Sequence, residues 1–184
     1  EVSFGNDGNI SQDRLEDCIN SDLANNYGNL CQRVTAFAIK NCNGKIPSEI
    51  KFQDEDLLIL NKYKENLDHI RSKIDHQNIN FYIDYIVNSL FEANKYFNDQ
   101  EPWKKKDDKI RLNTIVYTTL EIVRKISFLL YPIIPESSLK ALKIFDINET
   151  QIKLNTISNN EYLNKGDNIN KIDILFQKIE KNND

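Results

Sequence analysis

One short segment of the sequence combines a flat aromatic ring with adjacent positive charges. The only tryptophan of the chain, Trp103, follows Pro102 and precedes three consecutive lysines, Lys104, Lys105 and Lys106. An indole ring can stack on any base, and an ammonium group can contact the neighbouring phosphate. The segment therefore predicts a rigid turn that binds an unpaired nucleotide, and single-stranded RNA is the first ligand to consider.

A second group of polar residues recurs at helical spacing earlier in the chain. Asp22, Asn25, Asn29 and Arg33 are three or four positions apart, so they lie along one face of a helix. Arg33 offers a planar set of donors, and Asn29 can donate or accept a hydrogen bond. The pattern indicates a polar stripe on which Asn29 and Arg33 point the same way.

Each of these segments also has an ordinary structural interpretation. A lone tryptophan in a helical protein more often packs in the core, although the following lysines favour exposure of Trp103. A polar stripe is more often a solvated helix face. The lysines could belong to a linker before a helix, balanced by Asp107 and Asp108. The residues taken alone leave these alternatives open.

Composition sets the class of the fold and limits the partners. The chain has 184 residues, 40% of them hydrophobic, with five glycines and four prolines, and its apolar residues recur at helical spacing. The expected class is all-α. The formal charge is -4, so a nucleic-acid site must be a local patch, and a general attraction to DNA is not expected. No run of about 18 apolar residues is present, so we expect no membrane partner.

Hydrophobic spacing divides the chain into an antiparallel helix bundle and a C-terminal extension. We expect the bundle at 1–145 and, at 146–184, a loop and a terminal helix that pack on the bundle or on a catalytic domain outside this sequence. Capping residues and breakers place the individual helices at about 11–39, 54–75, 79–98, 107–130, 135–145 and 171–181.

The cysteines and histidines predict no metal site. Cys18, Cys31 and Cys42 lack the close pairs of a zinc site, and they are interpreted as buried thiols of a cytoplasmic protein. His69 and His76 lie on a charged helix without a neighbouring cysteine. Because the sequence opens without methionine and without the layout of a signal peptide, we expect an unexported fragment of a larger protein.

Several blocks of the sequence stand in a characteristic order, and together they resemble a known family. The blocks are Asn29-Leu30 with Arg33, Glu101-Pro102-Trp103, and the segments 2–11, 19–25, 130–136 and 175–180. In this combination they resemble the C-terminal anticodon-binding domain of bacterial methionyl-tRNA synthetase, a class I aminoacyl-tRNA synthetase. The resemblance spans nearly the whole chain, and it implies an all-helical domain.

The resemblance also implies a ligand and a set of binding residues. It places Asn29, Arg33 and Trp103 at the anticodon loop of tRNA(Met), whose anticodon is CAU. The discriminating base is the wobble cytosine, which presents two acceptors, O2 and N3, to the donors of Arg33. Lys104, Lys105 and Lys106 would contact phosphates, which is our inference from their charge and not part of the family pattern.

The catalytic half of that family is not in this sequence. The resemblance implies a parent methionine–tRNA ligase that uses ATP with magnesium, and methionine. The HIGH and KMSKS signatures and the zinc-binding cysteines are absent from the 184 residues. We therefore predict no catalytic residue, metal or cofactor here, and the expected partners are the anticodon loop and the catalytic domain of the same polypeptide.

Two alternatives remain at the level of the sequence. The anticodon-binding domain of another class I synthetase would lack the joint pattern of Asn29, Arg33 and Glu101-Pro102-Trp103. A helical protein-interaction module could instead use Trp103 as an anchor in a partner's pocket. The sequence also departs from the family at Ile172, Ile174 and Gln177, around which the family often has proline, and this difference concerns the packing of the C-terminal segment.

Overall fold

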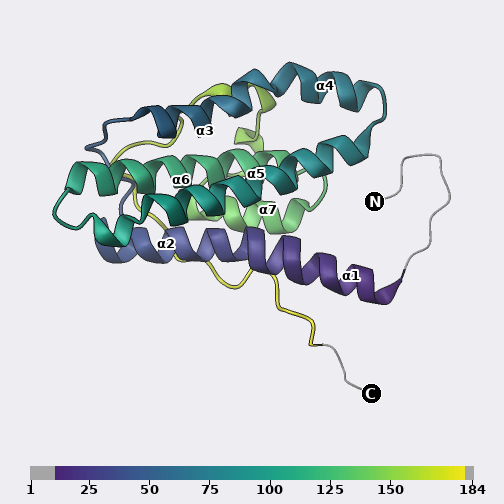
Figure 1. The fold of residues 1–184 in the computed structure, drawn as a ribbon, viewed down its shortest axis with the longest axis horizontal. Coiled ribbons are helices and arrows are strands. Elements are labelled where there is room, and N and C mark those ends of the chain that lie inside the picture. The colour runs from purple at the N-terminus through teal and green to yellow at the C-terminus, as the bar shows by residue number, and fades with distance from the viewer. Residues whose placement is uncertain (1–10, 181–184) are drawn as a thin grey trace.

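The central element of the structure is α6 (Lys109–Leu130), and the other long helices pack around it (Figure 1). This computed structural model describes residues 11–180, so most of the first sequence block, 2–10, lies outside the described range. From Leu112 to Leu130 nearly every side chain of α6 is buried. A helix that is buried on all sides needs neighbours on all sides, which explains its central position. The expected all-α bundle is confirmed.

The first predicted helix is continuous but changes its winding. It consists of α1 (Gln12–Cys18), the π-helical segment η1 (Ile19–Gly28) and α2 (Asn29–Asn41). In the π-helical segment the backbone hydrogen bonds reach back five residues, as in the bond from the Asn29 amide to the Ala24 carbonyl. The helix begins where Ser11 accepts a hydrogen bond from the Arg14 amide at 3.3 Å.

The prediction that all three cysteines are buried was wrong for two of them. Cys31 on α2 is buried, Cys42 is half-buried and Cys18 is exposed. Cys18 is exposed because α1 extends past the end of the bundle and buries none of its own residues (Figure 1), whereas Cys42 lies just after the last residue of α2. Burial raises the pKa of the Cys42 thiol to about 11.

The helix expected at 54–75 is divided in two by Asn66. The two parts are α3 (Asp54–Glu65) and α4 (Leu67–Asp75), and α5 (Ile79–Gln100) follows. The Asn66 side chain donates to the Lys62 carbonyl at 2.8 Å, and the Asn66 backbone amide also reaches that carbonyl. Two donors of Asn66 thus share one carbonyl at the residue where α3 ends and α4 begins.

The C-terminal part of the chain is mostly irregular, and the prediction of a helix at 171–181 was wrong. Between α7 (Pro135–Leu142) and residue 180 the helical elements are three short 3₁₀ turns, η3 (Lys143–Phe145), η4 (Glu149–Gln151) and η5 (Leu154–Ser158). Residues 171–180 form no helix, and 181–184 lie outside the described range. So short a helix is marginal by itself, and here the apolar side chains of the segment pack against the bundle in irregular conformation.

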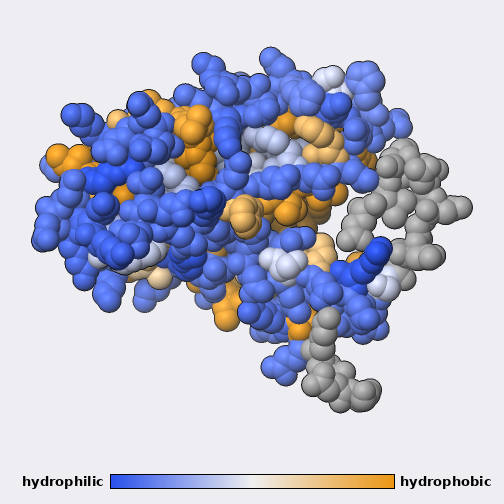
Figure 2. Space-filling view, in the orientation of Figure 1, coloured by the Kyte–Doolittle hydropathy of each residue, from blue (hydrophilic) through white to orange (hydrophobic). Residues whose placement is uncertain are grey.

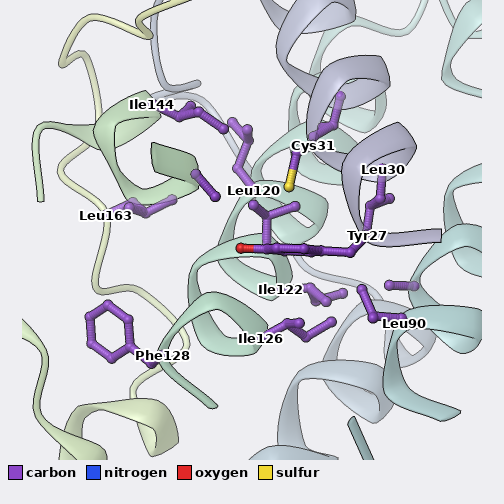
Figure 3. Packing of buried hydrophobic residues seen from close by; sticks show 14 of the residues in the cluster. Tyr27, Leu30, Cys31, Leu90, Leu120, Ile122, Ile126, Phe128, Ile144 and Leu163 are labelled. Atoms are coloured by element: carbon purple, nitrogen blue, oxygen red, sulfur yellow. The ribbon is translucent and has the colours of Figure 1, made fainter. Parts of the chain in front are cut away.

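The core forms where η1, α2, α5 and α6 meet. Figure 3 shows the Tyr27 ring lying between Cys31 and Leu120 on one side and Ile126 on the other. The Tyr27 hydroxyl is within 2.7 Å of the Ser127 hydroxyl, so its polar end is satisfied inside the core. Hydrophobic burial along α6 therefore fixes the positions of the outer helices, including the two that carry the candidate site.

Candidate nucleic-acid interface

Trp103 lies in the connection between α5 and α6. This connection contains the 3₁₀ turn η2 (Pro102–Lys104), and it follows Glu101, whose φ of 45° ends α5 in the left-handed region. Proline cannot continue an α-helix, and Pro102, which is buried, follows directly after the C-cap residue of α5. Trp103 is 40% exposed, so the indole is not a core residue.

Arg33 and Trp103 both lie against one buried ring, that of Phe97. The Arg33 guanidinium carbon lies 5.4 Å from the centre of the Phe97 ring, and the ring centroids of Phe97 and Trp103 are 6.2 Å apart at 68°. Arg33 Nη2 also donates to Asn98 Oδ1 at 2.6 Å. We call Arg33, Phe97, Asn98 and Trp103 the α2–α5 edge. Residues that are 70 positions apart in sequence thus share one surface of the bundle.

Asn29 lies one helical turn before Arg33 and lines a cavity. The cavity has a volume of about 360 Å³, and C-terminal residues form its other wall. Its lining consists of Ala24, Asn25, Asn29, Gln32, Ile174, Phe176, Gln177 and Lys178. The C-terminal segment packs directly on this part of the helix: a Cβ added at Gly28 would lie 3.5 Å from the Phe176 ring, an ordinary contact distance. Asn29 thus has polar neighbours from both ends of the chain.

The three lysines after Trp103 are exposed, but they are not equivalent. Lys104 pairs with Glu101 at 2.8 Å, and both side chains remain in solvent. Such a surface pair contributes only about 0–1 kcal/mol, so a phosphate could displace Glu101 at small cost. Within residues 11–180 no carboxylate lies in ion-pair distance of Lys105 or Lys106. These two are the more available charges.

The sequence did not indicate every residue of the edge. Phe97 was visible only as an apolar position of α5, and nothing marked Asn98 as the partner of Arg33. Gln177 and Lys178 belong to a sequence block quoted above, yet their place beside Asn29 depends on the course of a segment that was expected to be helical. Contacts between residues that are 65 or more positions apart leave no periodic pattern in the sequence.

The described residues do not themselves suggest a metal centre or a membrane span. Within 11–180 no group of three or more histidine, cysteine or acidic side chains could hold a metal ion. Over the same range no helix combines the length and apolar character that crossing a bilayer requires. Figure 2 shows a largely hydrophilic face on which apolar residues appear in separate small groups.

Comparison with known proteins assigns the chain to a family. Residues 46–184 match the family described as the anticodon binding domain of methionyl tRNA ligase. The chain belongs to this family. Methionine–tRNA ligase of Mycobacterium leprae is 36% identical over 163 residues, which are 86% of this chain and 30% of the relative. That of Thermotoga maritima is 33% identical over 182 residues, or 98% of this chain and 29% of the relative.

Solved structures agree with this assignment over almost the entire chain. The free form of Mycobacterium tuberculosis methionyl-tRNA synthetase superposes with a TM-score of 0.90 at 32% identity, covering 98% of this chain and 37% of that protein. The same synthetase bound by methionyl-adenylate gives a TM-score of 0.88. The chain spans about a third of the length of these relatives. The similarities do not favour a protein-interaction module or the domain of another class I synthetase.

Proposed function

We propose that this domain recognises the CAU anticodon loop of tRNA(Met), with Asn29, Arg33 and Trp103 as the residues that contact the bases. The observation that carries the proposal is that Arg33 and Trp103 lie against the same ring, Phe97, and that both reach the surface. A stacking face and a set of donors are thereby available to a single unstacked nucleotide. Membership of a family described as an anticodon binding domain supports a tRNA anticodon as the nucleic acid.

The affinity comes from stacking on Trp103. The Trp103 ring meets Phe97 at 68°, close to edge-on, so its faces do not stack on that ring. Stacking of one base on an aromatic side chain contributes about 1–3 kcal/mol and tolerates any base. Trp103 therefore holds the wobble base without identifying it.

The discrimination comes from Arg33 together with Asn29. Cytosine presents O2 and N3 as acceptors, whereas uracil carries a proton on N3, so a donor from Arg33 favours cytosine. One N–H of the Arg33 guanidinium is already held by Asn98, which fixes the plane of the group. An ordered donor loses less entropy when the base binds, and a wrong base leaves it unpaired.

In the parent enzyme this domain would place the tRNA relative to a separate catalytic domain. We infer that the parent is an ATP-dependent methionine–tRNA ligase of the cytoplasm, since its relatives carry that name and are about three times as long as this chain. Methionine, ATP and magnesium would bind in the part of the parent outside these residues. The residues described here bind and orient; they carry no step of the ligation.

The test is binding of labelled anticodon stem-loops, measured by fluorescence anisotropy. Wild type should bind a CAU loop more tightly than a UAU loop. Trp103→Ala should weaken binding of both loops by a similar factor, whereas Arg33→Ala should mainly remove the difference between them. Matched controls are Phe91→Ala and Arg71→Ala, which change an exposed aromatic ring and an exposed arginine outside the α2–α5 edge.

Two outcomes would overturn the proposal. Equal affinity of the wild type for both loops would show that the domain does not discriminate between them. An equal loss of affinity in the control variants would show that any exposed aromatic or cationic residue contributes to binding, wherever it lies. Salt gives a further check: with three or four phosphates neutralised, the log-log slope of affinity against salt should be roughly -2 to -3. A protein partner would give a much smaller slope.

A further inference from the structure

A buried ion pair lies beneath the turn that carries Trp103. Asp56 of α3 and Arg111 of α6 are joined by two hydrogen bonds, from Nη1 to Oδ2 at 2.6 Å and from Nη2 to Oδ1 at 3.0 Å. Both side chains are almost wholly inaccessible to solvent. Asp56 also accepts bonds from the Tyr96 hydroxyl and from the Gln53 amide. The pair therefore connects three helices through a fully hydrogen-bonded carboxylate.

Stability alone is a weak explanation for such a pair. Removing two charges from water costs much of what their attraction returns, and apolar residues of similar size are often as stable. What the pair supplies is a defined geometry, since two parallel hydrogen bonds hold the guanidinium in plane with its carboxylate. The same orientation also determines which neighbouring group Arg111 can contact.

The orientation of Arg111 serves the last residue of α5. The same Nη2 that contacts Asp56 also donates to Gln100 Oε1 at 2.6 Å. Gln100 is followed by Glu101, which adopts the left-handed conformation, and then by Pro102 and Trp103. A glutamate at positive φ is unfavourable by itself and persists only where its surroundings determine it. Arg111 holds the residue immediately before this turn.

The opposite side of the same helix end is held by Arg33. Asn98 accepts from Arg33 through its side chain, and its carbonyl accepts the Glu101 amide at 3.3 Å. Residues 98–100 are thus fixed by one arginine at the surface and by one in the interior. The direction in which the chain leaves α5, and with it the position of the indole, depends on both.

We propose that Arg111, acting through Gln100, is a positioning residue that holds the Trp103 turn in place for the nucleotide. Neither residue touches the RNA. This inference rests on the proposed function for its consequence in binding, but the placement of Trp103 can be measured without any RNA. Trp103 is the only tryptophan of the 184 residues, so tryptophan fluorescence, excited selectively over the eight tyrosines, reports on this one side chain.

The decisive variant is Gln100→Ala, which removes the connection and leaves the buried ion pair intact. We expect increased acrylamide quenching of Trp103 and roughly three- to tenfold weaker binding of the CAU stem-loop, because one hydrogen bond to a charged group is lost. Gln100→Glu keeps an accepting oxygen and should restore both values. In a Trp103→Ala background, Gln100→Ala should have no further effect on binding, since both act through the same ring.

Arg111→Lys and Arg124→Lys form the matched comparison. Both replace a buried, ion-paired arginine of α6, but position 124 lies about 20 Å further along the helix axis. Circular dichroism first checks that both variants are folded. Only Arg111→Lys should then change the acrylamide quenching of Trp103 and the affinity for the CAU stem-loop. If Gln100→Ala and Arg111→Lys both leave Trp103 quenching as in the wild type, the inference is wrong. Failure of the wild type to prefer CAU would instead overturn the proposed function alone.

Discussion

Two arginines of this chain lie over aromatic rings in opposite surroundings. Arg33 lies 5.4 Å from Phe97 at the surface and makes one hydrogen bond, to the exposed Asn98. Arg124 lies 4.5 Å from Tyr162, is inaccessible to solvent and pairs with the equally buried Glu121 at 2.8 Å. The side-chain chemistry is the same. The difference in burial decides that only Arg33 has donors within reach of a ligand.

The buried arginine belongs to a cluster that holds the irregular C-terminal part on the bundle. We call Glu121, Arg124 and Lys125 the α6 cluster. Glu121 accepts the Leu163 amide at 2.7 Å, and Lys125 donates to the Ile157 carbonyl at 2.6 Å. Buried backbone groups without a regular partner need one from side chains. The α6 cluster therefore uses its charges internally, whereas the α2–α5 edge leaves Arg33 donors at the surface.

The largest effect should follow from breaking the buried pair. Arg124→Met leaves the Glu121 carboxylate buried without its partner, and we expect the free energy of unfolding in urea to fall by about 3–5 kcal/mol. The matched change Arg33→Met should cost less than about 1 kcal/mol. Adding Glu121→Gln to Arg124→Met should recover part of the loss. A similar cost at both arginines would contradict the comparison.

A smaller effect, on binding alone, should follow from Arg33→Lys. Lysine keeps the charge but loses the planar set of donors, so affinity for the CAU stem-loop should fall by about tenfold. Binding of the UAU loop should change little, and the melting temperature should stay within the error of the wild type. If lysine binds CAU as well as arginine does, charge alone carries the contact and the proposed discrimination is wrong.

The α6 cluster should also make stability depend on pH through Lys125. Burial and the nearby Arg124 charge lower the pKa of the Lys125 ammonium to about 7, although Glu121 acts in the opposite direction. An unfolded lysine titrates near 10.4, so above pH 7 the unfolded chain binds more protons than the folded one. The free energy of unfolding should therefore rise by about 1 kcal/mol from pH 7 to pH 8. Lys125→Met should abolish this rise. If the free energy of unfolding depends on pH in the same way in that variant, another group is responsible for the rise.

The smallest effect should come from an exposed polar contact at the chain end. The Asn20 side chain forms two hydrogen bonds with the backbone of Ile179, at 2.8 and 2.9 Å. Because both residues are at the surface, Asn20→Ala should reduce stability by only a few tenths of a kcal/mol. Hydrogen exchange of the Ile179 amide should nevertheless become faster. The same substitution at the exposed Asn88 should leave that amide unchanged.

Local spacing was sufficient for the helices but not for the ends of the chain. Apolar residues three and four apart gave α5 and α6 within two residues of their bounds, since each helix forms by contacts between near neighbours. The break at Asn66 coincides with a side chain that shares the Lys62 carbonyl with the backbone amide, a contact that residue type alone does not predict. At 171–180 the same amphipathic spacing predicted a helix, and contacts such as Phe176 against Tyr27 held the segment in irregular conformation.

The sequence by itself determined the fold class and the family, because both depend on patterns of neighbouring residues, and the lysines after Trp103 only favoured its exposure over core packing. Only the tertiary structure decided that Arg33 and Trp103 lie against the same ring, Phe97, and that Arg111 reaches the residue before the turn. These contacts join separate helices, and their geometry follows from how the apolar faces pack around α6. Packing of that kind is a property of the whole chain, so no short pattern records it.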